Sequence, residues 1–524
     1  MSCSKIFSGE LPELTYDILK YFKNDFSTLH SCILVNRLWC RLAIPLLWEN
    51  PFSNPTKNYN FIESYLNNLN GDLKTELNEY RIEDNLFPSN TLFNYPSLLK
   101  YLNTWKILSP VHKWSENAVK TLKPEKRDLS EIENFQRLIQ MLLYKLIIDN
   151  DANLHTLEIE IHCGTRNSYF NNILELLLQN PNFIIHNVKN LNFYIRDEFY
   201  RVNKYMIAKN HILQLINLHQ NLKKISLTAD KFLLYQSLLL TKDYNCSNTL
   251  NTIILDHVNF KDIINLDIIF DQLKVLESVH LIYCRSLNTS FIQQIINLNR
   301  PFKLKSLIID EGSQIDDSSF QLLLQKCGGY LENFGDNFGV QSEILLESII
   351  KYCKNIKSLY LSKFKDQIVY LLFDLIENMK QSLNYLTISV AGCENCIESS
   401  SIVLQNLGQV LPFKLEYLNL NLHIKISDFE VFLKNSQDTF IKKLLINNLE
   451  GQDFLPYIKE YIMKKKRVKY LAIMHSFEST SDDENYDYKE LASLKDEVEE
   501  FKLYDIKVQR LYSLLISFYE FTRD

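Results

Sequence analysis

Glycine is scarce in this chain of 524 residues: there are 11, where average usage of about 7% would give roughly 37. Phosphate-binding loops, nucleophile elbows and dinucleotide-binding turns depend on clusters of glycine, but the only adjacent pair here is Gly328 and Gly329. An H-E-x-x-H motif or another close pair of histidines is also missing. The sequence therefore predicts a protein that is not an enzyme and needs no cofactor or metal.

The sequence also lacks a large excess of either charge and lacks long apolar runs. The net charge is −6 with no basic cluster of the size that nucleic acid requires. No run approaches the roughly 18 apolar residues of a membrane span, and the start MSCSKIFSGELPE has no signal-peptide core. The 10 cysteines are scattered, which favours free thiols in a reducing compartment. We expect a cytoplasmic or nuclear protein that binds neither nucleic acid nor membrane.

What the chain does contain is a periodic apolar triplet of the form L-x-x-L-x-L. It returns about every 28 residues and gives twelve units, with a less secure thirteenth. A period in this range indicates a repeat array, which offers an extended surface rather than a pocket. The triplets start at Leu154, Val188, Leu222, Leu250, Leu276, Leu304, Leu331, Ile356, Leu383, Leu415, Ile441, Val468 and, less securely, Val498.

Each repeat reads as a short strand, a turn and a helix. In the unit that starts at Leu276, alternating apolar residues predict a strand, and Asn288 precedes apolar residues at helical spacing. One such unit cannot bury both its strand and its helix, so neighbours must stack. The unit at Leu331 is degenerate, because Asp336 stands where an apolar residue belongs. We therefore expect an α/β solenoid with parallel strands on its concave side.

These units resemble leucine-rich repeats. The period fits the strand-plus-helix horseshoes of that family, and Cys284 and Cys353 resemble its cysteine-containing variety. Side chains alternate along a strand, so the residues between the apolar positions should face the concave side. Among them, tyrosine and asparagine suit protein recognition, although solubility alone also requires polar residues there. The candidate target-binding residues are Tyr194, Tyr360, Tyr385, Tyr417 and Asn419.

Residues 10–52 predict three short helices with a dense apolar set. Pro12 suits a first helical turn, Asn24 and Asp25 can cap a second helix, and a third should stop near Pro45. So small a module cannot bury all of its apolar side chains. It should leave a face for a partner.

This segment resembles the F-box, through Leu11-Pro12-Glu13-Leu14, the Cys32…Val35-Asn36…Trp39 spacing and the closing Leu47-Trp48. The resemblance implies docking on a Skp-family adaptor, which links F-box proteins to a cullin and to a ubiquitin-conjugating enzyme. For Val35 and Trp39, an internal core position is an equal alternative. The residues that the resemblance assigns to adaptor contact or its support are Leu11, Pro12, Leu14, Ile18, Leu29, Val35 and Trp39.

The order of modules resembles the large fungal proteins that join an F-box to leucine-rich repeats. It implies an F-box at 8–52, an irregular helical linker or cap at 53–150 and repeats at 151–475. An acidic loop, a last repeat and a C-terminal helix should fill 476–524. The resulting expectation is a non-catalytic substrate receptor of an SCF-type (Skp-cullin-F-box) ubiquitin ligase. The alternative is a repeat scaffold that binds a partner protein outside any ligase.

Three short motifs are weaker signals. The pair Cys393 and Cys396 lacks two further zinc ligands at suitable spacing, so a chance placement in a loop is favoured. The run Lys464–Arg467 resembles a nuclear-localisation cluster, but cations at the end of a helix are also expected. The acidic stretch Glu478–Asp487 suits either an acid-directed kinase or a solvated insertion.

Overall fold

The structure is a computed structural model, and its chain divides into two compact units. Unit 1 comprises Met1–Ser226 and Thr241–Leu250, and unit 2 comprises Leu227–Leu240 and Asn251–Asp524. The structure describes residues 11–522 apart from 24, 54–58, 70, 79, 81–91, 123–128, 163–169, 197–201, 220, 229–247, 262, 311–312, 314, 337–342, 364–367, 391–395, 450–452 and 477–487. Cys393 and the acidic stretch Glu478–Asp487, on which two of the weaker motifs rest, lie outside the described residues.

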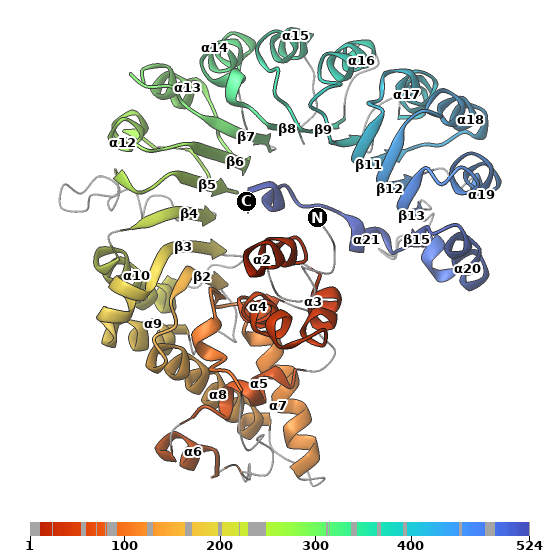
Figure 1. The fold of residues 1–524 in the computed structure, drawn as a ribbon. Coiled ribbons are helices and arrows are strands. Elements are labelled where there is room, and N and C mark those ends of the chain that lie inside the picture. Colours follow the sequence, from red (N-terminus) through yellow and green to blue (C-terminus); the bar gives the residue numbers. More distant parts are fainter. Residues whose placement is uncertain are drawn as a thin grey trace. The chain divides into compact units, whose positions relative to one another are not determined.

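Unit 1 begins with helices and continues into parallel strands (Figure 1). Its helices are α2 (Pro12–Lys20), α3 (Phe26–Ile33), α4 (Arg37–Trp48), α5 (Phe61–Leu66), α6 (Gly71–Asn78), α7 (Leu108–Leu122), α8 (Leu129–Asp149), α9 (Phe170–Gln179) and α10 (Val202–Leu218). Short helical turns are η1 (Pro51–Ser53), η3 (Pro96–Leu98) and η5 (Phe183–Asn187). Its strands are β1 (Tyr101–Asn103), β2 (Leu154–His162), β3 (Val188–Arg196) and β4 (Leu222–Thr228), the last crossing the unit boundary.

Of the three N-terminal helices, α2 begins at Pro12 without a side-chain cap, whereas α3 and α4 begin at side-chain caps. The Asp25 side chain accepts a hydrogen bond from the Thr28 N–H at 3.1 Å and so begins α3. Asn36 does the same for α4 through the Trp39 N–H at 2.9 Å. The expectation that the third helix stops near Pro45 is wrong, because α4 continues to Trp48. A proline inside a helix costs about 3 kcal/mol, and the packing of Leu46 and Trp48 outweighs that cost.

The end of α4 connects this helical module to the first strand of unit 1. The Trp48 ring stacks on Tyr95 with centroids 4.0 Å apart. The Glu49 carbonyl accepts from the N–H groups of Lys100 and Tyr101, at 2.9 and 3.0 Å, and its carboxylate pairs with Lys23. Within unit 1, β1 then pairs in parallel with β2, and β2 with β3. The region 53–150, expected to be irregular, thus supplies a strand of its own.

Unit 2 repeats a strand and a helix, with strands on the inner side of an arc and helices on its outer side (Figure 1). The strands are β5 (Thr252–Asp256), β6 (Ser278–Cys284), β7 (Leu304–Ile309), β8 (Asn333–Asp336), β9 (Ser358–Ser362), β10 (Tyr385–Ser389), β11 (Lys414–Leu422), β12 (Phe440–Asn448), β13 (Val468–Ser476), β14 (Tyr488–Glu490) and β15 (Lys507–Val508). The helices are α12 (Leu266–Gln272), α13 (Thr289–Ile296), α14 (Asp317–Cys327), α15 (Glu343–Tyr352), α16 (Val369–Asn378), α17 (Cys396–Val410), α18 (Ile426–Asn435), α19 (Leu455–Ile458), α20 (Lys495–Leu503) and α21 (Leu511–Leu514). Helical turns are η8 (Gly328–Tyr330), η10 (Lys459–Met463), η11 (Leu491–Ser493) and η12 (Phe518–Thr522).

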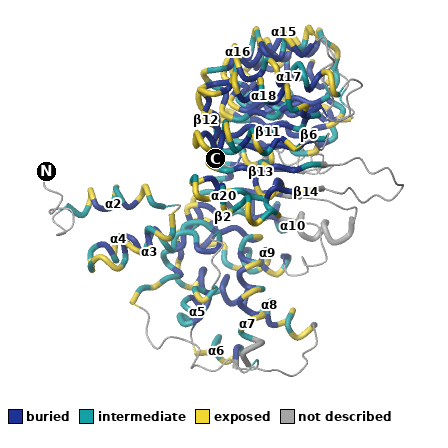
Figure 2. Tube along the Cα trace, turned by 90° about the vertical axis from the view of Figure 1, so that its right-hand side faces the viewer, coloured by how far each residue is buried: buried dark blue, intermediate teal, exposed yellow. Residues whose placement is uncertain are grey.

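The strands from β5 to β13 pair in sequence order and in parallel. β14 is antiparallel to β13, and β15 is parallel to it. The mixed α/β architecture with a long, mostly parallel sheet is compatible with an α/β solenoid. The strands of unit 2 are largely buried, and exposed residues gather on its outer helices (Figure 2).

One repeat shows why the sequence folds in this way. In β6, Val279 and Leu281 are fully buried and face the helices. The Asn288 side chain accepts from the Phe291 N–H at 3.0 Å and begins α13, as the sequence predicts. Cys284 is buried, and its Sγ lies 3.3 Å from the Leu255 carbonyl oxygen of the preceding repeat. In this repeat a local cap begins the helix, and a buried side chain contacts the preceding repeat.

All twelve secure triplets overlap a strand, from Leu154 in β2 to Val468 in β13. The degenerate unit still forms β8, where Asp336 is 4% exposed and pairs with Leu361 across the ladder. The thirteenth unit is wrong, because Val498 lies within α20. The chain returns to the sheet only at Lys507, where β15 adds two residues beside β13.

Candidate functional site

The three-helix module α2–α4 has a small core of its own. That core contains Leu19, Leu29, Cys32, Trp39, Ala43 and Leu46. Two of the residues assigned to adaptor docking, Leu29 and Trp39, are therefore buried, at 0% and 8% exposed. The core alternative for Trp39 fits this placement, so both residues can support a docking face but cannot form its surface.

The remaining docking candidates lie at or near the surface of the module. Leu14 is 40% exposed and Val35 is 49% exposed, whereas Leu11, Pro12 and Ile18 are half-buried. The core alternative for Val35 does not fit its exposure. Exposed apolar side chains mark a binding surface where they form one contiguous patch.

Two exposed apolar residues of the module were missed at the level of sequence. Leu34 is 76% exposed and directly precedes Val35 between α3 and α4. Tyr21 is 89% exposed at the end of α2. The signal that could have found Leu34 is its place in a short connection, since such connections run over the surface.

In unit 2, the tyrosines expected to bind a target lie on neighbouring strands. Tyr385 of β10 is opposite Tyr417 of β11, and their ring centroids are 6.4 Å apart. Tyr360 of β9 pairs with Thr387, two residues further along β10, and Thr387 in turn pairs with Asn419. The ladder thus brings together four of the five candidates. The fifth, Tyr194 of β3 in unit 1, is only 4% exposed.

The chain's own C-terminal segment packs on these tyrosines. The Phe518 ring lies 5.6 Å from that of Tyr360, and the Phe521 ring lies 4.7 Å from that of Tyr385, both edge to face. Tyr417 is 4% exposed and belongs to one apolar cluster with Leu511 and Leu514. Burial raises the pKa of the Tyr417 hydroxyl to about 12. The segment therefore covers Tyr417 almost completely and leaves Tyr360 and Tyr385 half-buried.

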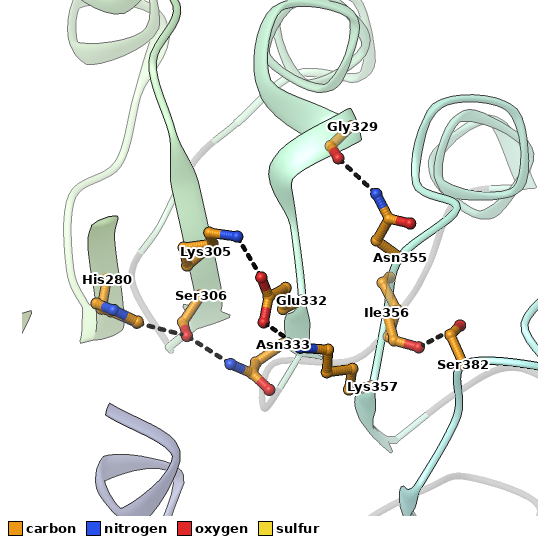
Figure 3. A network of polar contacts seen from close by, with 10 residues as sticks. All are labelled: His280, Lys305, Ser306, Gly329, Glu332, Asn333, Asn355, Ile356, Lys357 and Ser382. Atoms are coloured by element: carbon orange, nitrogen blue, oxygen red, sulfur yellow. Dashed lines mark hydrogen bonds and ion pairs between the residues drawn. The ribbon is translucent and has the colours of Figure 1, made fainter. Parts of the chain in front are cut away.

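A buried ladder of polar side chains crosses β6, β7 and β8 (Figure 3). The Ser306 hydroxyl lies 2.8 Å from Nδ1 of His280 and accepts from Nδ2 of Asn333 at 2.9 Å. All three residues are less than 9% exposed. Because buried polar groups are costly when unpaired, the ladder fixes the register of three consecutive repeats.

We expect Ser306→Ala to lower the free energy of unfolding by about 1–2 kcal/mol, because it leaves His280 and Asn333 without a shared partner. Urea denaturation followed by circular dichroism measures the change. The exposed Ser427 offers a matched control, and Ser427→Ala should stay within about 0.5 kcal/mol of the wild type. Equal effects of the two substitutions would show that the ladder contributes nothing.

Beside this ladder, Glu332 lies between Lys305 and Lys357 (Figure 3). Burial raises the pKa of the Glu332 carboxyl, but hydrogen bonds and charge from the two lysines outweigh burial and leave it below 4.5. The folded state therefore gains stability from the ionised carboxylate above pH 4.5. That contribution is lost as the pH falls through the lower pKa of the folded state.

Unit 1 contains a cavity of about 750 Å³, whose lining includes His155, His186, Lys189 and His219. Nε2 of His219 lies 2.7 Å from the Val188 carbonyl oxygen, and burial lowers the pKa of this imidazole. His219 is therefore a neutral, structural part of the wall. Across the described ranges, no three His, Cys, Asp or Glu side chains group closely enough to hold a metal ion.

Comparison with known proteins adds no identification. No protein-family model matches the chain, and no curated protein matches its sequence. In the part of the chain that the structure describes, no helix combines the length and the apolar character needed to cross a bilayer. Function must therefore be argued from the module α2–α4 and the inner face of unit 2.

Proposed function

We propose that the chain is the substrate-recognition subunit of an SCF-type ubiquitin ligase. Residues 8–52 act as an F-box that binds a Skp-family adaptor, and the inner face of the leucine-rich repeats holds a target protein. The chain makes and breaks no bond. It brings a bound target close to a conjugating enzyme that the adaptor and a cullin recruit, so that catalysis arises from proximity.

One observation carries the proposal: F-box-like residues fold into a three-helix module that keeps Leu14, Leu34 and Val35 at its surface. Trp39 and Leu29 lie in the core of the same module. Exposed apolar residues on a small module indicate a partner with a complementary apolar surface. An adaptor of the Skp family meets that requirement.

The test is co-purification with a Skp-family adaptor and a cullin. Leu14→Glu and Val35→Glu place a charge on the proposed docking face without touching the core. Each should weaken adaptor binding at least about tenfold, which corresponds to about 1.4 kcal/mol. Binding is measured by isothermal titration calorimetry with the purified adaptor. The triple replacement of Leu11, Pro12 and Leu14 by alanine should abolish binding.

Phe413 provides a matched control, because it is 75% exposed and lies in unit 2. Phe413→Glu should leave adaptor affinity unchanged. Unaltered binding by the triple variant would mean that the docking face is elsewhere. Recovery of the adaptor without a cullin would instead favour the alternative function, a repeat scaffold that acts outside a ligase.

A further inference from the structure

The C-terminal segment, defined here as residues 511–522, crosses the inner face of unit 2 (Figure 1). It starts beside β13, where β15 pairs with Tyr470 and Leu471, and the Gln509 N–H donates to the Leu471 carbonyl at 2.9 Å. α21 then packs on β12 and β13, and η12 packs on β6. The segment therefore runs back over most of the strands that precede it.

Four apolar side chains attach the segment to the strands. Leu511, Leu514 and Phe518 are 6%, 4% and 8% exposed, and Phe521 is half-buried. Leu511 and Leu514 come from α21, and Phe518 and Phe521 come from η12, with the non-helical residues 515–517 between the two turns. In the same segment Tyr512 and Leu515 are exposed, at 72% and 41%. The segment thus presents one apolar edge to the sheet, as a bound peptide does.

The strands are shaped to receive this edge. Tyr283 of β6 has a φ of 49°, at a point where the pairing of β6 with β7 shifts register. Bulky side chains rarely adopt such a backbone conformation, and bulges often re-aim a side chain. The Tyr283 ring lies 6.2 Å from Phe518, which also contacts Tyr360. Two tyrosines from separate strands therefore flank one phenylalanine.

Side chains carry much of this contact. Within the segment, Ser513, Leu515 and Glu520 donate their N–H groups to the carbonyls of Arg510, Leu511 and Ser517, all of them local. The Leu511 N–H donates to the Glu490 carboxylate at 3.1 Å. The backbone of Ile516 also hydrogen-bonds to the Tyr417 side chain. None of these hydrogen bonds belongs to a strand ladder, so the segment can separate from the sheet while the ladder stays intact.

We propose that the inner face of β6–β13 is a groove for an apolar peptide, and that the C-terminal segment is its intramolecular occupant. The peptide that fits has two leucines followed by two phenylalanines in the pattern L-x-x-L-x-x-x-F-x-x-F. This inference rests on the proposed function, because it assigns that chemistry to the target. A target segment must displace the occupant. The smaller the fraction of molecules whose groove is open, the weaker is the apparent affinity for the target.

The test uses the full-length protein and a fluorescent synthetic peptide of residues 509–522. Fluorescence anisotropy compares the wild type with the double variant Phe518→Ala/Phe521→Ala, whose own segment is weakened. The variant should bind the peptide at least about tenfold more tightly than the wild type. A peptide with both phenylalanines replaced by alanine should not bind either protein. Adding Tyr385→Ala to the double variant should remove the gain.

Tyr512→Ala is the matched control, because Tyr512 lies in the same segment but points to solvent. It should leave peptide affinity at the wild-type value. A folded double variant that binds the peptide no better than the wild type overturns the proposal. The peptide measurement does not include the adaptor. A negative result would therefore overturn the groove proposal without bearing on the F-box hypothesis.

If the double variant does not fold, hydrogen exchange of the wild-type protein provides a second test. The amides of 511–522 should exchange at least about tenfold faster than those of β10–β12, because the segment opens without the sheet. Equal protection of the two sets of amides would show that the C-terminal segment is a permanent part of the core, and it would overturn the proposal.

Discussion

Replacing Arg467 by alanine should lower the free energy of unfolding of unit 2 by about 3 kcal/mol. Arg467 is 7% exposed, and its guanidinium donates to four backbone carbonyls. Those carbonyls belong to Leu433, Ser436, Thr439 and Tyr461, and the first two lie at the end of α18. The last carbonyls of a helix have no partner inside it. Without the guanidinium these carbonyls would lose a donor, although that of Ser436 keeps a backbone partner, the Thr439 N–H at 3.0 Å.

Thermal denaturation measures this effect. A loss of about 3 kcal/mol should lower the melting temperature by about 6 °C for a unit of this size. Arg467→Lys should recover only part of the loss, because an ammonium group cannot reach all four carbonyls at once. Lys464→Ala, in the same basic run but exposed, should change the melting temperature by less than about 1 °C. If the arginine variants match this control, the guanidinium does not support α18.

The same contacts bear on the basic run Lys464–Arg467. The run follows α19 and the helical turn η10, as the helix-end interpretation predicts. Because Arg467 is engaged in the core of the repeat, an import receptor could contact only the three lysines while the fold is intact. A nuclear-localisation signal at this site would therefore consist of three lysines, one residue fewer than the basic run in the sequence.

Gly408→Ala should destabilise unit 2 by about 2 kcal/mol, and Gly408→Val by more. Gly408 lies inside α17, where a Cβ would stand 2.8 Å from the Phe432 carbonyl oxygen and 2.9 Å from Cβ of Asn435 in α18. Alanine improves helix propensity by about 1 kcal/mol. That gain is smaller than the cost of forcing two packed helices apart. Chemical denaturation of the purified variants measures the balance.

Gly329→Ala provides the matched control, because no atom lies within 4 Å of a Cβ at that position. It should be neutral or slightly stabilising. A Gly408→Ala protein as stable as the wild type would mean that α17 and α18 separate at no cost.

Much of the fold is predictable from local pattern. The alternation in each triplet specifies a strand with one apolar face, and all twelve secure triplets overlap strands. Asp25 and Asn288 begin helices through side-chain caps that depend only on residues three positions away. These features are local in sequence, so they need no knowledge of distant contacts.

Errors arose where distant contacts outweigh a local signal. Pro45 should end a helix, yet Trp48 packs against Tyr95 and α4 continues. Val498 continues the apolar period, but it lies in α20 after the last full strand of the array. The strand Tyr101–Asn103 carries no triplet and forms because β2 offers a free edge for pairing.

The sequence by itself determined the repeat architecture and the three-helix module, because periodic burial and helix caps are encoded within a few residues. It also indicated the tyrosines of β9–β11 as special positions. Only the tertiary structure decided that Trp39 is core while Val35 is exposed. Likewise, only the structure revealed that Phe518 and Phe521 cover the inner face. Such contacts join residues more than 100 positions apart, and a local pattern cannot specify them.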